Sequence, residues 1–585
     1  MSHPTPGRGR RPLVIAVAVG LLAIIGIYVF TARDGAAANR TDCVSLELSS
    51  STEKDDILAA AADTYNRSGR EFAGDKCAKV SVHGLTSGAG MEALSKGWTA
   101  ADTGQPQPQV WAPSTSLWLS RLEARGQSAV AVSSIHPSIM SSPLVVAMPE
   151  MMAKVFLEKN PNPGWADILK LATAPGGWGS LGHPEWGEFK LGRDHPELSS
   201  SGLGASMATF HAAAVANGFP KIDESNVGNA GVLRFVHDVE SSVARYSKDA
   251  AEFVDLLAAE DKKNLPVPYV SAVVMQEELA FTYNKRGPIR KFQAIYPKDG
   301  ALQFDHPYVV LTSATADQRA AADDFFKFIS EPETQAVFRA TGFRDRGAPN
   351  TPTQELRDVL SVPAEQSLPT MPLPEPKLAE EIVKLWNSTR REARVLLVLD
   401  ISGSMTQEAN KSDPELGDTT KITLVKPAAK RALDLLSAKD EVGLWTFSSP
   451  GHTEVVPIGK LSDNKAAITQ AIDGINPVGG TALYDTVAAA HAKMIQSVDA
   501  DRINAIVVLS DGQDDSKVPP PAALLAKINP ELTERAMPIF TISFGKDADP
   551  DAMRLIASTS KALAYDAVKD PKNIDEVFTA VFRNF

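Results

Sequence analysis

The sequence predicts an α/β protein made of two modules that follow an apolar amino-terminal segment. Two observations support this fold class. Strand-like and helix-like segments alternate between residues 41 and 345 and again between 393 and 585, which is typical of parallel sheets covered by helices. A proline-rich stretch separates the two alternating series and predicts a boundary between the modules.

Length and composition exclude several classes of protein. The chain has 585 residues, of which 43% are hydrophobic and 22% charged, so it can bury several sizeable cores. It has 59 basic and 71 acidic residues, and this net charge of −12 argues against a general nucleic-acid-binding protein, which needs a basic face. Its two cysteines are too few for an iron–sulfur protein or a Cys-rich zinc module.

The first 40 residues predict a membrane anchor. Residues 1–12 contain Arg8, Arg10 and Arg11 and precede the uncharged run LVIAVAVGLLAIIGIYVF. As a helix this run is about 27 Å long, close to the thickness of the bilayer core, so we expect a transmembrane helix at 13–32. The arginines predict a cytoplasmic amino terminus and an exported remainder, held at the cell membrane. The alternative is a signal peptide that is cleaved near residues 36–38, which would release a secreted protein.

Export bears on Cys43 and Cys77, which lie in the same early segment. An oxidising compartment allows them to form a disulfide bond. Closing a loop of about 35 residues in this way stabilises a fold by roughly 3–4 kcal/mol in the chain-entropy model. The alternative is a pair of reduced, buried thiols. A metal site is not expected, because two sulfurs without a nearby histidine are too few ligands.

Short polar loops precede the helices of the first module, which we place at 41–345. The loops are SSSTEK, GLTSGAG, PSTS and SSSG. Helix N-termini with serine hydroxyls suit anions or polyols. Taken singly, each loop is also typical of an ordinary helix cap, and Ser50 with Glu53 matches a capping box.

The region from about Thr41 to Phe343 resembles bacterial extracellular solute-binding proteins of the two-lobed, type II periplasmic-binding class. The segments with this resemblance are VWAPSTSLWLSRL, SSPLVVAMPE, GHPEWGEFKLGRDHPELSSSGLGA and MQEELAFTYN. It implies two α/β lobes that close about a hinge around a small solute. From their positions in loops, the candidate ligand contacts are Ser50, Ser51, Ser87, Ser114, Ser116, Ser200, Ser201, Gly202 and Gln276.

Residues 346–392 are predicted to connect the two modules. Seven prolines lie between positions 349 and 376, which suits an extended and semi-rigid segment. The helical pattern KLAEEIVKLWNSTRREAR follows them. We therefore expect a proline-rich linker that ends in a connecting helix.

The second module, at 393–585, has an oxygen-rich motif directly after its first predicted strand. In RVLLVLDISGSM, the residues Asp400, Ser402 and Ser404 occupy alternate positions of a turn. Side chains at the carboxyl ends of parallel strands converge on one edge of an open sheet, where Thr481 and Asp511 are also expected. Hydroxyl and carboxylate oxygens are ligands that Mg²⁺ prefers. The alternative is a turn capped by Asp and Ser side chains.

This motif resembles the metal-ion-dependent adhesion site of von Willebrand factor type A domains, which have a Rossmann-like fold. The resemblance covers about Arg394–Phe585. It implies that Ser402 and Ser404 bind the cation directly and that Thr481 binds it directly or through water. It also implies that Asp400 and Asp511 act mainly through bound waters. The cofactor would be Mg²⁺, with Mn²⁺ or Ca²⁺ as substitutes, and an acidic side chain of a protein partner would complete the coordination.

Together the modules resemble bacterial membrane-anchored proteins with substrate-binding and von Willebrand factor type A domains. We expect a cell-surface binding protein for a small solute and an acidic protein partner. The alternatives are a solute receptor of an ABC transporter, a cell-envelope enzyme, and a first module that has lost its ligand. We do not expect an enzyme, because the sequence has no G-x-S-x-G, H-E-x-x-H or Walker A motif, and its S-x-x-K at 51–54 lacks the rest of a penicillin-binding signature.

Overall fold

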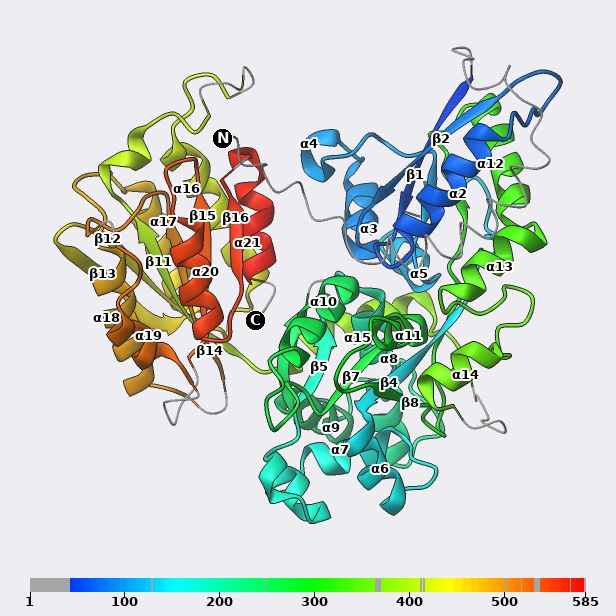
Figure 1. Cartoon of the computed structure of the whole chain (residues 1–585), viewed down its shortest axis with the longest axis horizontal. Coiled ribbons are helices and arrows are strands. Elements are labelled where there is room, and N and C mark those ends of the chain that lie inside the picture. Colours follow the sequence, from blue (N-terminus) through cyan, green and yellow to red (C-terminus); the bar gives the residue numbers. More distant parts are fainter. Residues whose placement is uncertain are drawn as a thin grey trace, which may run out of the picture. The chain divides into compact units, whose positions relative to one another are not determined.

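The computed structural model describes residues 43–127, 130–247, 249–362, 370–410, 413, 416–499, 502–516, 518–530, 537–568 and 570–582. The chain divides into two compact units, 1–389 and 390–585 (Figure 1). The expected cytoplasmic segment 1–12 and transmembrane helix 13–32 lie outside the described residues. None of the helices that are described combines the length and the apolar character needed to cross a membrane.

The first unit contains two lobes, each built on its own sheet (Figure 1). The first lobe has the strand order β10-β3-β1-β2, in which β1 runs parallel to β2 and β3, and β10 is antiparallel to β3. Leu46 and Leu48 of β1 are fully buried in one core with Phe325 of α12. The elements of this lobe are β1 (Val44–Ser50), α2 (Asp55–Arg67), β2 (Ala78–Gly84), α3 (Ser87–Lys96), α4 (Ala100–Thr103), β3 (Val110–Ala112), α5 (Leu117–Ala124), β10 (Val309–Val310), α12 (Ala316–Ile329) and α13 (Pro332–Ala340).

The second lobe has the strand order β6-β5-β7-β4-β8, with β9 paired to β4. Strand β4 is buried along its whole length because it pairs on both sides and is antiparallel to β7 and β8. The elements are β4 (Ser142–Pro149), α6 (Glu150–Lys159), α7 (Trp165–Ala172), β5 (Leu191–Asp194), α8 (Ser200–Ala216), α9 (Ala230–Ser241), β6 (Val243–Ser247), α10 (Ala250–Asp261), β7 (Ala272–Gln276), α11 (Glu277–Lys285), β8 (Phe292–Ile295), β9 (Gln303–Phe304) and α14 (Gln354–Leu360).

Helix α15 (Pro376–Thr389), which the sequence assigned to the connector, belongs to the first unit and packs on both lobes. Its Glu380 accepts a hydrogen bond of 2.7 Å from Arg121 of α5, and its Trp386 is fully buried against His195 beside α8. The boundary between the units therefore lies between Thr389 and Arg390. A fragment that ended at residue 345 would lack a helix that joins the lobes.

The predicted disulfide bond between Cys43 and Cys77 is confirmed, with an S–S distance of 2.05 Å. The two cysteines directly precede β1 and β2, which are parallel neighbours, and the backbone N–H of Val44 donates to the carbonyl of Cys77 at 2.8 Å. The bond closes a loop across a sequence separation of 34 residues. It therefore fixes the start of the first sheet.

Replacing both cysteines with serine is expected to lower the free energy of unfolding by roughly 3–4 kcal/mol, because the unfolded chain regains the entropy of the open loop. Urea unfolding of the full chain measures this difference. Adding a reductant should destabilise the wild type to the same extent and leave the double variant unchanged. Equal stability of the oxidised wild type and the variant would contradict the prediction.

The second unit is one sheet with the strand order β13-β12-β11-β14-β15-β16, parallel except for the edge strand β13. Leu397 of β11 packs in the core on one face of the sheet, and Leu396 in the core on the other. This two-sided burial explains the continuous apolar run of the strand. The elements are β11 (Ala393–Asp400), α16 (Lys421–Ala432), β12 (Glu441–Ser448), β13 (Gly451–Lys460), α17 (Leu461–Asp473), α18 (Leu483–Gln496), β14 (Ile503–Ser510), α19 (Ala522–Ile528), β15 (Ile539–Phe544), α20 (Pro550–Thr559), β16 (Ala564–Ala567) and α21 (Ile574–Phe582).

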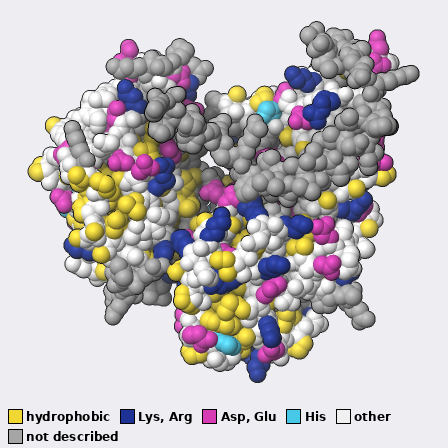
Figure 2. Space-filling view, viewed as in Figure 1, with side chains coloured by type: hydrophobic (Ala, Val, Ile, Leu, Met, Phe, Trp, Pro, Cys, Tyr) yellow, Lys and Arg dark blue, Asp and Glu magenta, His cyan; other side chains and the backbone are white. Residues whose placement is uncertain are grey.

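Charged side chains of both signs are distributed over the surface. On the face drawn in Figure 2, basic and acidic side chains of the described residues are interspersed, with hydrophobic side chains in small groups between them. Mixed charge of this kind is typical of a solvated surface.

Candidate functional site

Loops from both lobes of the first unit enclose a small polar cavity, which we call the serine cavity. Its volume is about 10 Å³. A water molecule needs about 10–15 Å³, so the cavity has no room for a larger solute in this conformation. The lining residues are Ser51, Thr52, Glu53, Thr86, Ser87, Ser114, Leu198, Ser199, Ser200, Asp249, Ala250 and Gln276.

Five of the nine predicted ligand contacts line this cavity: Ser51, Ser87, Ser114, Ser200 and Gln276. Three of them form a chain of hydroxyls across the lobes, because Ser200 Oγ lies 3.3 Å from Ser87 Oγ and Ser87 Oγ lies 3.4 Å from Ser114 Oγ. The sequence therefore identified loops in both lobes that join strand ends to helix starts and line the serine cavity.

The other four predicted contacts do not line the cavity. Ser50 Oγ donates to the carbonyl of Ser51 at 3.1 Å, and the backbone N–H of Ser116 donates to Asp305 at 2.8 Å. Ser201 is fully buried within α8. Gly202 has a packing role, since a Cβ there would lie 2.3 Å from the carbonyl oxygen of Asp194.

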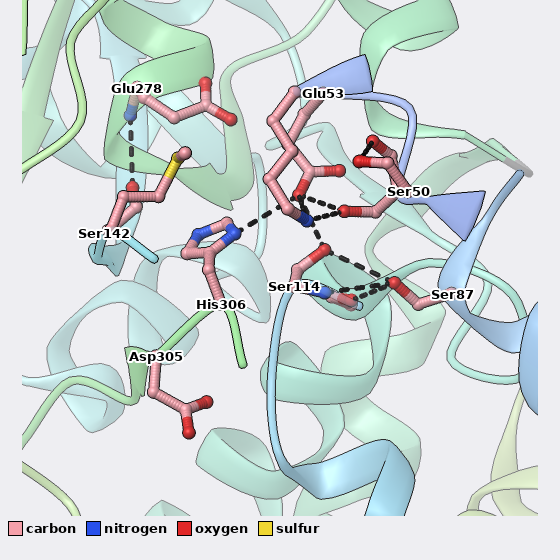
Figure 3. A network of polar contacts seen from close by, with 12 residues as sticks. Ser50, Glu53, Ser87, Ser114, Ser142, Glu278, Asp305 and His306 are labelled. Atoms are coloured by element: carbon pink, nitrogen blue, oxygen red, sulfur yellow. Dashed lines mark hydrogen bonds and ion pairs between the residues drawn. The ribbon is translucent and has the colours of Figure 1, made fainter. Parts of the chain in front are cut away.

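Glu53 is the centre of a buried polar network beside the hydroxyls (Figure 3). Ser51 and Ser114 each donate to its Oε1 at 2.7 Å, and Lys54 Nζ lies 3.4 Å from the same oxygen. Burial opposes a charged carboxylate, but Lys54, His306 and the two hydroxyl donors outweigh burial and lower the pKa of Glu53 to about 2. Glu53 therefore places a negative charge in the wall of the cavity at neutral pH.

The capping box predicted for Ser50 and Glu53 is wrong. Helix α2 begins at Asp55, Lys54 occupies its N-cap position, and no side chain caps it. Glu53 turns inward because the fully buried Lys54 and the hydroxyls of the first lobe supply its partners. Sequence reasoning missed this role, although the S-x-x-K spacing contained the two residues, and Lys54 Nζ does donate to Ser51 Oγ.

Glu278, the second residue of α11, brings another carboxyl group towards this network from the second lobe. In Figure 3 its side chain points towards Glu53. The residue is 2% exposed. Its Oε1 has no hydrogen-bond partner among the described residues. Burial, together with the charge of Glu53, raises the pKa of Glu278 well above its usual value.

In the second unit, the predicted motif residues converge where β11 and β14 end. Ser402 Oγ lies 2.9 Å from Ser404 Oγ, and Ser404 Oγ donates to Asp511 Oδ1 at 2.8 Å. The loop of Thr481 reaches the same place because Gly403 N–H donates to the carbonyl of Gly479 at 2.8 Å. All of the oxygen-bearing residues expected at this edge of the sheet are therefore brought together.

The carboxylate of Asp400 stabilises the turn through hydrogen bonds. Its Oδ1 accepts the backbone N–H of Ser402 at 2.8 Å, and its Oδ2 accepts the hydroxyl of Ser510 at 2.6 Å. The side chain is fully buried, and burial together with the nearby charge of Asp511 raises its pKa to about 6. Two buried carboxylates so close together are an arrangement that a cation stabilises.

Two further residues shape this site, and the sequence motif did not include them. Lys421, the first residue of α16, is fully buried, and its Nζ lies 2.7 Å from Asp511 Oδ2 and 3.3 Å from Asp547. Asp515 accepts the backbone N–H of Thr481 at 2.9 Å and fixes that loop. In the described parts of the chain, no three His, Cys, Asp or Glu side chains are grouped to hold a metal ion.

Comparisons with known families agree with this division. Residues 57–344 match the family of bacterial extracellular solute-binding proteins, and residues 395–580 match the von Willebrand factor type A domain. The first match indicates a binding protein with an extracellular or periplasmic solute-binding domain. More particularly, the chain joins a bacterial extracellular solute-binding domain to a von Willebrand factor type A domain.

Solved structures show only distant similarity. The periplasmic binding protein AfuA from Actinobacillus pleuropneumoniae is 12% identical, with 60% of this chain and 99% of that chain covered and a TM-score of 0.40. A periplasmic thiamin binding protein is 10% identical, with 61% and 98% covered and a TM-score of 0.41. A von Willebrand factor type A protein from Catenulispora acidiphila is 24% identical, with a TM-score of 0.28. The match covers 33% of this chain and 43% of that protein. The search of curated proteins found no match.

Proposed function

We propose that this chain is a cell-surface binding protein, held in the membrane by a helix at 13–32, that recognises an acidic protein partner through a metal ion and a small solute through its first unit. The convergence of Ser402, Ser404 and Asp511 is the observation that supports this function most directly. Such a protein recognises its ligands without transforming them. Delivery of the solute to an ABC transporter is the second candidate, favoured by the solute-binding family match.

The side chains of the second unit fit a divalent cation. Ser402 Oγ, Ser404 Oγ and Asp511 Oδ1 lie 2.8–3.4 Å from one another, and hard cations such as Mg²⁺ prefer oxygen ligands. Ser402, Ser404 and Thr481 would hold the ion, and Asp400 and Asp511 would hold its waters. When bound, the ion supplies a Lewis-acidic position for a partner's carboxylate. Titration of the full chain with Mg²⁺ or Mn²⁺ tests this function. We expect one tight binding site for the ion, and a chelator should remove the bound ion.

Replacing Lys421 with methionine is expected to raise the affinity for Mg²⁺ about tenfold or more. The substitution removes a buried positive charge that lies 2.7 Å from Asp511 and opposes a cation. Lys426→Met is the matched control on the same helix, since its Nζ donates only to the carbonyls of Asp473 and Ile475. Titration calorimetry measures both variants. Unchanged or weaker binding by Lys421→Met would contradict the prediction.

The serine cavity favours an uncharged, hydroxyl-rich solute over an anion. Its lining residues include hydroxyl groups and the carboxylates of Glu53 and Asp249 but no lysine or arginine. The negative charge of Glu53 would repel an anion, whereas a polyol can exchange hydrogen bonds with the serines. We therefore propose the polyol class for this solute.

A thermal-shift screen of the full chain against sugars, polyols and anions tests the solute, because a ligand that binds only the folded state raises its stability. Sugars or polyols should stabilise the wild type. Ser200→Ala, which removes a hydroxyl bonded to Trp118 and Ser87, should abolish the shift. The exposed Ser462→Ala is the control and should keep it. Stabilisation by anions alone would contradict the polyol class.

The arrangement around Ser51 favours binding over catalysis. A nucleophilic serine needs a base that accepts its proton. Here Ser51 donates to Glu53, whose lowered pKa of about 2 makes it a weak base, and Lys54, whose pKa is lowered by burial, is held by both Ser51 and Glu53. The Ser51–Lys54 pair therefore fits a structural network better than a catalytic one.

A further inference from the structure

A second and much larger pocket lies between the two lobes, and we call it the acidic pocket. It has a volume of about 770 Å³, within the range of about 300–1,000 Å³ typical of small-molecule sites. Its walls are residues 52–57 of the first lobe, helices α10 and α11 of the second lobe, and residues 340–343. It adjoins the serine cavity at Thr52 and Glu53 but is otherwise lined by different residues.

The charges around the acidic pocket favour a positively charged ligand. Six acidic and only three basic side chains line it. Two of the basic side chains are already paired, Lys285 with Glu355 at 2.8 Å and Arg286 with Asp255. Three of the acidic groups have basic partners, Glu53 with Lys54, Asp255 with Arg286 and Asp261 with Arg290, so the buried position open to a ligand is the carboxyl group of Glu278.

Glu278 is an unpaired acceptor in the wall of this pocket. The residue is 2% exposed, and its Oε1 has no hydrogen-bond partner among the described residues. The nearby Lys54 is already engaged by Glu53 and Ser51. A buried carboxyl group without a partner is costly, and a ligand ammonium would supply both the hydrogen bond and the opposite charge.

Apolar side chains make up another part of the pocket wall. Ile57 of α2, Phe281 of α11 and Phe343 come from three different segments and line the same space. Aromatic faces attract cations, and the apolar walls gain from covering a hydrocarbon or aromatic body. The pocket thus combines a buried carboxyl group, whose Oε1 has no hydrogen-bond partner among the described residues, with an apolar enclosure.

We propose that the acidic pocket is a second ligand site, which binds an organic cation with an apolar body and places its ammonium group at Glu278. This site is separate from the serine cavity and takes a different chemical class of ligand. It does not depend on whether a polyol binds between the serine loops.

Saturation-transfer NMR of the full chain tests the proposal with phenethylamine, tryptamine and benzylamine as probes and 2-phenylethanol as the uncharged match of phenethylamine. The cations should bind, and the alcohol should bind at least tenfold more weakly. Glu278→Gln, which keeps the shape of the side chain, should weaken the cations at least tenfold, and Thr282→Trp should block them by filling the pocket. The exposed Glu123→Gln is the control and should leave them unchanged.

Three results would overturn the proposal. One is equal binding of phenethylamine and the alcohol, and another is the absence of binding by all three cations. The third is full binding of the cations by folded Glu278→Gln, which would place the ammonium group away from Glu278. If a polyol still binds to Glu278→Gln, the serine cavity binds its ligand independently of the acidic pocket.

Discussion

Replacing Arg344 with methionine is expected to lower the free energy of unfolding by about 3–5 kcal/mol, because it leaves a buried carboxylate without its partner. Arg344 Nε and Nη2 donate to the two oxygens of Glu277 at 2.7 and 2.6 Å, and neither side chain is exposed to solvent. The pair lies at a crossing between the lobes, since Phe343 belongs to the core of the first lobe and Leu356 to the core of the second.

A nearby exposed ion pair provides the control for Arg344. Arg339 lies 2.7 Å from Asp345, and both side chains are about one-third exposed, so Arg339→Met should cost about 0–1 kcal/mol. Urea unfolding of the full chain compares the two variants. The double variant Glu277→Met with Arg344→Met should be more stable than Arg344→Met alone, because no unpaired charge is left buried. Similar losses for Arg339→Met and Arg344→Met would contradict the prediction.

Removing both serine hydroxyls of the motif is expected to weaken Mn²⁺ binding by a factor on the order of 100 or more. Ser402→Ala with Ser404→Ala deletes two oxygens that lie 2.9 Å apart. The turn should persist, because the backbone N–H of Ser402 still donates to Asp400 and the strand below remains buried. Titration calorimetry measures the affinity.

The exposed serines Ser462 and Ser558 provide a matched double alanine control, which should bind Mn²⁺ as the wild type does. Near-ultraviolet circular dichroism should be alike for all three proteins. Unchanged metal affinity in a folded Ser402→Ala, Ser404→Ala variant would mean that the motif is only a capped turn.

The sequence predicted most of the fold and brought together much of the candidate cation site because both depend on local patterns. The run RVLLVLD is apolar because β11 is covered on both faces, and the alternate positions of Asp400, Ser402 and Ser404 place their side chains in one turn. Asp511 follows because strands of a parallel sheet end at the same edge, whereas Thr481 lies in the loop between α17 and α18. The disulfide was predictable for a similar reason, since each cysteine directly precedes one of two neighbouring strands.

The sequence did not predict features that depend on contacts between distant segments. Lys421 reaches Asp511 across a separation of 90 residues, and no spacing rule links the first residue of α16 to the end of β14. Glu53 matched a local capping box, but hydroxyl and ammonium partners of the folded lobe draw it inward. The unpaired carboxyl of Glu278 depends on how the two lobes enclose it, which is a property of the assembled unit.

Water proton relaxation of the Mn²⁺-loaded full chain tests the central claim most directly, because bound Mn²⁺ with an exchangeable water enhances relaxation. The account predicts enhanced relaxation when Mn²⁺ is added, and a decrease when N-acetyl-aspartate amide supplies a carboxylate that replaces the water. N-acetyl-asparagine amide, its uncharged match, should have no effect, and the Ser402→Ala, Ser404→Ala variant should show no enhancement. Wild-type relaxation that does not respond to the carboxylate, or equal enhancement in the variant, would contradict metal-dependent recognition of an acidic partner.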